Sequence, residues 1–261
     1  MKEVAIITGA SGGIGYEIAL LFAQKKIDIL IVARNEKKLE NIKSAIEQQY
    51  NITVFCVATD LATSEGFVAI NNCVTSNNLS VNYLVNNAGF GDYGFFTERS
   101  MEKYSEMLGL NIISVTELTY YYAKQMIKNG KGRILNVAST AGIQPDPYFA
   151  VYGASKAYVI SLTEAIHKEF ENTRVTATVL SPGATKTKFM ERADMSDAKL
   201  YESGVMSAKK VAQVGFDGMM RGSLHVIPGF KNKLLAFFSS IMPSSKLRLN
   251  IAAMVMSRKD Q

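Results

Sequence analysis

The sequence has few of the residues that build disulfides or metal sites. Its two cysteines, Cys56 and Cys73, are too few for a disulfide framework. We expect both to be reduced, buried side chains in a cytosolic protein. The two histidines, His167 and His225, have no ligand spacing between them. The sequence therefore predicts no metal site, and we assign both histidines to packing or solvent.

Long apolar runs are absent as well. No segment reaches about 18 consecutive apolar residues, the length at which a helix can span a bilayer. The chain enters the apolar run Val4–Ile7 almost at once, whereas a secretory signal begins with a basic region and continues with an apolar one. We therefore expect a cytoplasmic protein with no secretory signal and no spanning helix.

Net positive charge is concentrated at the C-terminal end, because basic and acidic residues nearly balance in the rest of the chain. The formal net charge is +6, and residues 231–261 alone contain six Lys or Arg residues against one Asp, a net of +5. The basic character therefore belongs mainly to this final segment. We expect no nucleic-acid binding, because the basic and acidic residues of the rest of the chain nearly cancel and leave no excess that would follow a phosphate backbone.

An alternation of apolar runs and amphipathic stretches organises the rest of the chain. Apolar residues make up 48% and charged residues 20%, which is typical of a soluble globular protein. The pattern predicts an α/β fold, a single doubly wound parallel sheet of about seven strands with helices on both faces. We expect strands at Glu3–Thr8, Asp28–Ala33, Thr53–Ala58, Tyr83–Asn86, Gly132–Ala138, Arg174–Leu180 and Ser223–Ile227. We expect helices at Gly15–Lys25, Asn35–Gln49, Ser64–Ser76, Met101–Asn129, Ala150–Glu171 and Ala208–Arg221.

A glycine-rich turn, Thr8-Gly9-Ala10-Ser11-Gly12-Gly13-Ile14-Gly15, follows the first predicted strand directly. Glycines allow the tight turn and let a pyrophosphate approach the backbone, while the N-terminus of the next helix supplies N–H groups and positive dipole. Such a turn is a weak signal by itself. Between the first strand and the first helix of an alternating chain, it predicts dinucleotide binding.

Tyr152 and Lys156 are four residues apart in a predicted helix, with Ser139 upstream. Positions i and i+4 share a helix face, so the phenol and the ammonium would lie side by side. A nearby cation lowers the pKa of a phenol toward the range useful for acid–base catalysis. Taken alone, such a pair is more often an ordinary surface pair. The glycine-rich turn and Ser139 favour a catalytic role instead.

Together these residues resemble the short-chain dehydrogenase/reductase family. The pattern Thr-Gly-x-x-x-Gly-Ile-Gly is the family's form of the turn, and its other motifs follow in order. They are Asp60, Asn86-Asn87-Ala88-Gly89, Asn111, the set Ser139, Tyr152 and Lys156, Pro182-Gly183, and Thr187. The resemblance covers about residues 3–230 and implies a Rossmann-like fold. We therefore divide the chain into a dinucleotide-binding catalytic domain, residues 1–230, and a basic amphipathic helical extension, residues 231–261.

The resemblance implies a catalytic set of Asn111, Ser139, Tyr152 and Lys156. Tyr152 would be the general acid, Ser139 would stabilise the developing oxyanion, and Lys156 would lower the tyrosine pKa. Asn111 would hold a water that returns protons, although it could instead be a structural residue that kinks its helix. The implied cofactor contacts are Gly9, Ser11, Gly12, Gly13, Ile14, Gly15, Asp60, Leu61, Asn87, Ala88, Gly89, Tyr152, Lys156, Pro182, Gly183 and Thr187. Asp60 has an alternative role as the N-cap of the following helix.

Arg34 carries the prediction of cofactor preference. It follows Ala33 at the end of the second predicted strand, where NAD-binding folds usually place an Asp or Glu against the ribose 2′-hydroxyl. A guanidinium there can hold a 2′-phosphate with paired N–H donors. We predict NADP(H) rather than NAD(H), with assistance from Asn35 and from Lys37 or Lys38. The alternative is that Arg34 is a solvated loop cation.

The predicted function is NADPH-dependent reduction of a ketone or aldehyde to an alcohol, a reversible reaction on a small molecule. Two alternatives remain open, a 3-oxoacyl-thioester (acyl-carrier-protein) reductase and a non-catalytic NADP-binding redox sensor. Residues 188–206 correspond to the family's substrate lid, and their Met and aromatic side chains (Phe189, Met190, Met195, Tyr201 and Met206) suit an apolar substrate. Ordinary helix packing would explain them equally well.

The extension departs from the minimal family pattern. Leu247, Ile251, Met254 and Val255 fall at helical spacing, with basic residues near the ends of the segment. Such a helix can pack on the protein itself, lie peripherally on an anionic membrane, or bind a partner. We expect a homodimer or homotetramer. A dimer through the helices at Met101–Asn129 and Ala150–Glu171 is favoured over the family's tetramer, whose interfaces the extension would disturb.

Overall fold

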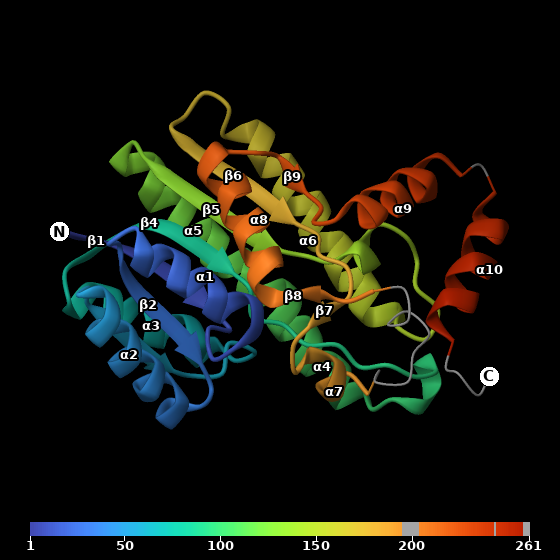
Figure 1. Ribbon diagram of the computed structural model, residues 1–261, viewed down its shortest axis with the longest axis horizontal. Helices are drawn as coiled ribbons and strands as arrows, with labels where there is room; N and C mark the ends of the chain where they lie inside the picture. Colours follow the sequence, from blue (N-terminus) through green and yellow to red (C-terminus); the bar gives the residue numbers. More distant parts are fainter. Residues whose placement is uncertain (195–203, 243, 258–261) are drawn as a thin grey trace.

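The computed structural model describes residues 1–194, 204–242 and 244–257. A seven-stranded sheet with the order β3-β2-β1-β4-β5-β6-β9 forms the centre of the molecule (Figure 1). Every neighbouring pair of strands is parallel. The strands are β1 Lys2–Thr8, β2 Asp28–Ala33, β3 Val54–Ala58, β4 Leu79–Asn86, β5 Gly132–Val137, β6 Val175–Leu180 and β9 His225–Val226. The predicted parallel sheet is confirmed.

Helices cover both faces of this sheet because β1 to β6 are apolar on both sides. On one face α1 (Gly13–Gln24), α2 (Glu36–Tyr50) and α8 (Ala208–Arg221) bury a core in which the rings of Phe22 and Phe216 meet edge to face, 5.0 Å apart. On the other face α3 (Ser64–Ser76), α5 (Ser114–Asn129) and α6 (Ala150–Glu169) bury Tyr122 and its neighbours. The fold is therefore doubly wound, as predicted.

The helix predicted at Met101–Asn129 is interrupted. The structure has α4 (Met101–Leu108), one π-helical turn at Gly109–Ile113, and then α5. Apolar periodicity cannot reveal a single widened turn, because the same face is regained after it. Gly109 lies against the carbonyl of Ala62, where a Cβ would approach the oxygen to 2.9 Å.

Three further details differ from expectation. The sequence did not predict α7 (Phe189–Arg192), nor the short parallel pair of β7 (Thr185–Lys186) and β8 (Met206–Ser207). These elements are too short to carry a periodic signal. Cys56 and Cys73 are free thiols, but both are half-buried rather than buried. Burial nevertheless raises the pKa of Cys56 to about 12.

The C-terminal segment folds into two helices, α9 (Phe230–Ile241) and α10 (Ser245–Met256), which stand as an arch on the α6 side of the molecule (Figure 1). Both ends of the arch are attached to the main fold. Asn232 of α9 lies against Gly183, where a Cβ would be 2.7 Å from its Nδ2, and the Tyr93 hydroxyl donates to the carbonyl of Met256 at 2.5 Å. Across the described ranges, no helix combines the length and apolarity that a membrane span requires.

Candidate active site

A cavity of about 1240 Å³ opens where the strands end, between the sheet and the C-terminal arch. It collects almost all of the residues that the sequence singled out. Those that line it are Gly9, Ser11, Gly12, Gly13, Ile14, Arg34, Asp60, Leu61, Asn87, Ala88, Gly89, Ser139, Tyr152, Lys156, Pro182, Gly183 and Thr187. Gly15 and Asn111 do not reach its surface and instead support it from behind.

The glycine-rich turn is held closed by Asn87. Its Nδ2 donates to the carbonyls of Thr8 and Gly9, at 3.0 and 3.4 Å. Gly9 has a φ of +66°, and a Cβ on Gly15 would lie 2.5 Å from Asn87 Nδ2. Only glycine fits both positions. The N-cap of α1 is Gly12, which has no side-chain cap, so the N–H groups at this helix N-terminus face the cavity.

Charged groups meet at the β2 end of the cavity. Arg34 Nη1 lies 3.2 Å from Glu106 Oε1 of α4 and 3.6 Å from Asp60 Oδ2. Arg34 is 62% exposed, so the alternative of a solvated loop cation stays open, and its nearest carboxylate comes from α4 rather than from β2. Lys38 reaches over the turn, with Nζ 3.5 Å from where a Cβ of Gly12 would be.

Asn35 and Asp60 have local structural partners. Asn35 caps α2, because its Oδ1 accepts from Lys38 N at 2.9 Å. Asp60 Oδ1 accepts from Ala62 N at 2.9 Å, which shapes the loop before α3. The residue at the N-cap of that helix is Thr63, so the alternative role of Asp60 as N-cap was wrong.

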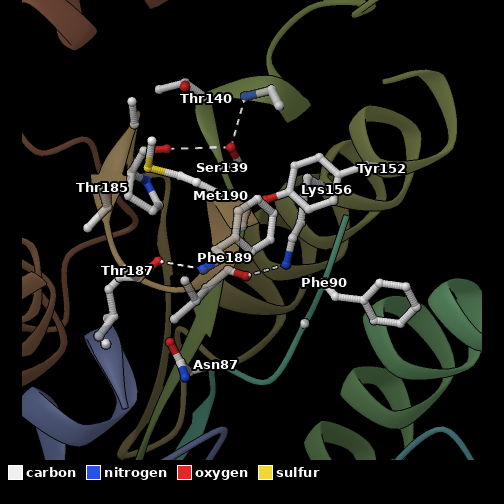
Figure 2. Close-up of a pocket in the computed structure, with 18 of the residues that line it drawn as sticks. Asn87, Phe90, Ser139, Thr140, Tyr152, Lys156, Thr185, Thr187, Phe189 and Met190 are labelled. Carbon is white, nitrogen blue, oxygen red and sulfur yellow. Dashed lines mark hydrogen bonds between the residues drawn. The ribbon is translucent and has the colours of Figure 1, made fainter. Parts of the chain in front are cut away.

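Tyr152 and Lys156 lie together in the first turns of α6, both buried (Figure 2). Lys156 Nζ donates to the carbonyl of Val137 at 2.9 Å and lies 5.7 Å from the centre of the Tyr152 ring. Burial lowers the pKa of Lys156 to about 8, because an ammonium is poorly solvated there. The Tyr152 ring is stacked on Phe149 at 4.3 Å, which fixes its direction.

Ser139 faces the same space from the end of β5 (Figure 2). Its Oγ accepts from Ala141 N at 3.1 Å and approaches the carbonyl of Pro182 at 3.5 Å. The hydroxyl is thus oriented by the backbone on both sides. Thr187 Oγ1 accepts from Phe189 N at 3.2 Å, which orients this hydroxyl just before the short helix α7.

Asn111 lies in the π-helical turn and is fully buried. Its side chain exchanges two hydrogen bonds with the backbone of Phe90 and donates to Ser155 Oγ at 3.1 Å. A Cβ on Gly89 would lie 3.0 Å from Asn111 Oδ1 and 3.3 Å from Lys156 Nζ. Because Gly89 has no side chain, the Asn111 amide and the Lys156 ammonium can both lie close to its Cα.

Sequence reasoning missed part of the cavity wall. Asp146 is buried in it, and burial raises its pKa to about 7. Gln144 donates to Asp146 at 3.4 Å and accepts from Ser239 of α9 at 2.8 Å. Asp146 carried no recognisable spacing, and a C-terminal helix gives no sign in sequence of which cavity it borders. Of the predicted lid residues, Met195 and Tyr201 lie outside the described residues.

The chain belongs to the short-chain dehydrogenase family, whose model matches residues 3–198. An uncharacterized oxidoreductase of Staphylococcus epidermidis is 31% identical over 202 residues, 77% of this chain and 86% of that protein. The rat very-long-chain 3-oxoacyl-CoA reductase is 27% identical, over 94% of this chain and 80% of its own. This protein is accordingly an NAD(P)-dependent oxidoreductase that acts on CH–OH and C=O groups.

Solved structures share the fold across nearly the whole chain. A 7β-hydroxysteroid dehydrogenase structure superposes with a TM-score of 0.86 at 21% identity, covering 96% of both chains. A short-chain dehydrogenase from Sphingobium yanoikuyae in complex with NADPH gives 0.81 at 25% identity, covering 94% of this chain and 98% of that one. One from Burkholderia phymatum in complex with NAD gives 0.82 at 23%, covering 91% of this chain and 92% of its own. Relatives of both cofactor types thus have this fold.

The residues present fit a nicotinamide dinucleotide. The glycine cradle leaves backbone N–H groups open to a pyrophosphate, the cations Arg34 and Lys38 lie at one end, and Tyr152 and Lys156 lie at the other. Within the described ranges, no three His, Cys, Asp or Glu side chains come close enough together to hold a metal ion.

Proposed function

We propose that this protein is an NADPH-dependent carbonyl reductase that converts a ketone or aldehyde to an alcohol, and the alcohol back again. The observation that carries the proposal is the convergence of Ser139, Tyr152 and Lys156 in the cavity that also contains the glycine-rich turn. An acid, a cation and an oriented hydroxyl at one place match the needs of a carbonyl that gains negative charge as it is reduced.

In this mechanism the bound cofactor supplies the hydride. The Ser139 hydroxyl donates a hydrogen bond to the substrate oxygen, and Tyr152 transfers its proton to the same oxygen. The buried ammonium of Lys156 stabilises the resulting phenolate by its charge. Asn111, held by Phe90 and Ser155, holds the water that returns the proton. The stacked ring of Phe149 keeps Tyr152 in position.

The proposed cofactor contacts follow the same geometry. Gly9, Ser11, Gly12, Gly13 and Ile14 of the turn face the pyrophosphate, with Gly15 supporting the turn from behind. Asp60, Leu61 and the turn Asn87-Ala88-Gly89 face the adenosine half, and Pro182, Gly183 and Thr187 face the nicotinamide. Arg34 prefers a 2′-phosphate because its present ion pairs are exposed, and exposed pairs contribute only about 0–1 kcal/mol. Lys38 adds a second cation, whereas Asn35 acts through the cap of α2.

Fluorescence titration with NADPH and NADH tests this preference. Wild type should bind NADPH more tightly, and Arg34→Ala should bring the two affinities together. Glu106→Gln should tighten NADPH binding about fivefold, since removing a carboxylate worth about 1 kcal/mol frees Arg34 for the phosphate. Equal binding of both cofactors by wild type and Arg34→Ala would show that the preference is absent.

Two other functions stay as alternatives. A 3-oxoacyl-thioester reductase is favoured by the similarity to the very-long-chain 3-oxoacyl-CoA reductase. Screening NADPH oxidation with ketones, aldehydes, 3-oxoacyl-CoA and 3-oxoacyl-acyl-carrier-protein substrates separates it from the main proposal. A non-catalytic NADP-binding redox sensor would oxidise NADPH with none of these substrates.

We also propose a cytoplasmic location and a dimer formed through α5 and α6. The free thiols suit a reducing compartment. Ile113, Tyr120 and Tyr158 are exposed large side chains around α5 and α6, and the Tyr158 hydroxyl hydrogen-bonds Thr116 across the two helices. An exposed apolar surface on two helices that are linked by a hydrogen bond suits the two-fold symmetric interface of a dimer.

Peripheral membrane contact is a separate proposal for the outside of the arch. Phe230, Phe237 and Ile241 of α9 are more than half exposed, and Lys231 and Lys233 lie beside them. Apolar and basic side chains together bind anionic bilayers. The protein should sediment into the pellet with phosphatidylserine vesicles and should stay in the supernatant with pure phosphatidylcholine vesicles. Equal recovery in both supernatants would contradict the proposal.

A further inference from the structure

The C-terminal arch contributes one wall of the cavity. Arg248, Ile251, Ala252 and Val255 of α10 line it at helical spacing, so a single face of this helix looks inward. The other lining residues of the arch are Leu235, Ala236, Phe238 and Ser239 of α9 and Met242, which follows that helix. Among the described residues of the arch that line the cavity, Arg248 alone is charged.

The guanidinium of Arg248 is poorly satisfied by the protein. Its Nη1 donates to the carbonyl of Ser239 at 3.5 Å, the long limit of a hydrogen bond, and its buried Nε has no acceptor. No carboxylate of the described ranges forms an ion pair with it. By contrast, Arg99 donates from Nε and Nη2 to both oxygens of Asp92. A buried donor on a cation is costly unless an anion meets it.

Asp146 does not serve as that anion, although it lines the same cavity. Its Oδ1 accepts from Gln144, and its pKa is raised by burial, with no cation acting to lower it. A guanidinium in contact would lower that pKa. Asp146 and Arg248 are instead the two ends of a polar chain that runs through Gln144 and Ser239.

We propose that Arg248 binds a carboxylate on the substrate, at the end distant from the carbonyl that is reduced. This inference rests on the proposed carbonyl reductase function. Ser139 and Tyr152 receive the carbonyl, and the apolar side chains of α9 and α10 receive a bulky hydrocarbon body. The planar fork of N–H donors on Arg248 matches a carboxylate. The substrate class is therefore an oxo-carboxylic acid with a large apolar skeleton.

Steady-state kinetics with NADPH tests this with a 7-oxosteroid carboxylate and its uncharged methyl ester, on wild type, Arg248→Met and Lys246→Met. Lys246 is an exposed cation on the same helix that does not line the cavity, so its variant controls for net charge. Wild type and Lys246→Met should prefer the acid in kcat/KM. Arg248→Met should lose about tenfold or more on the acid, through KM, and retain its kcat on the ester.

A calorimetric titration makes the result independent of turnover. Dodecanoate and its methyl ester are titrated into NADP⁺-loaded protein, and dodecanoate should bind more tightly to wild type and Lys246→Met than to Arg248→Met. Equal binding of dodecanoate by all three proteins overturns the carboxylate site even if ketones are reduced. If Arg248→Met weakens the binding of 3-oxododecanoyl-CoA but not of dodecanoate, the carboxylate site is overturned, and Arg248 binds a phosphate of the CoA instead. A protein that binds dodecanoate through Arg248 but reduces no carbonyl compound would refute the proposed function instead.

Discussion

At the residue scale, burial gives the site its electrostatic character. Lys156 is buried with a single carbonyl partner, so its pKa falls to about 8, and Asp146 is buried with an amide partner, so its pKa rises to about 7. Both shifts arise from the loss of solvation of the charged form. The two groups border one cavity, and the same cause shifts their pKa values in opposite directions, into neighbouring pH ranges.

The lowered pKa of Lys156 predicts a pH dependence of reduction. The side chain is charged below about pH 8 and loses its charge as the pH rises through that value, well before an ordinary lysine would. Carbonyl reduction should therefore decline above about pH 8, because the phenolate is no longer stabilised. The measurement is kcat/KM with NADPH from pH 5 to pH 10. Asp146→Asn is the control, and loss of this decline in that variant would assign it to Asp146 instead.

At the element scale, the arch of α9 and α10 is what distinguishes this site. Met256 is buried in the cluster that contains Tyr93, Phe149 and Tyr152, so the end of α10 is packed into the apolar cluster that surrounds the proposed general acid. Sequence periodicity indicated an amphipathic helix here but did not show what its apolar face contacts. The contacts show that part of its apolar face lines the cavity.

Met256→Ala tests this attachment, with Met254→Ala as control. Met256 is 4% exposed and Met254 is 66% exposed, so only the first substitution removes buried packing. A buried Met→Ala change costs about 2–5 kcal/mol, which should loosen α10 and raise KM for bulky ketones. Limited proteolysis should cut the arch faster in Met256→Ala than in wild type. Identical cleavage and KM in both variants would show that α10 is not attached by this contact.

At the scale of the whole molecule, the parallel sheet, its helices and the cavity followed from sequence because each depends on regular patterns. Alternating apolar runs define strands, and Gly9 and Gly15 mark the turn that Asn87 closes. Features that depend on contacts between residues far apart in the sequence could not be predicted. Glu106 joins Arg34 from 72 residues away, and Ser239 joins Gln144 from 95 residues away, and neither pairing leaves a local pattern.

The exposed surface of α5 and α6 predicts self-association. Tyr120 is 65% exposed on α5, and a charge placed there should be buried uncompensated in a dimer. Light scattering after gel filtration should give a dimer for wild type and a monomer for Tyr120→Glu. Val68→Glu, on the exposed side of α3, should remain dimeric. A wild-type monomer, or a dimer in all three proteins, would place the contact elsewhere.

Tyr152→Phe tests the central claim most directly. NADPH oxidation in the presence of a reducible ketone is measured for wild type and variant, alongside NADPH affinity by fluorescence. The phenyl ring keeps its stacking on Phe149 but has no proton to give. Turnover should fall about 100-fold or more while NADPH affinity stays within about twofold of wild type. Undiminished turnover in the variant would contradict the account, because the proton would then come from another group.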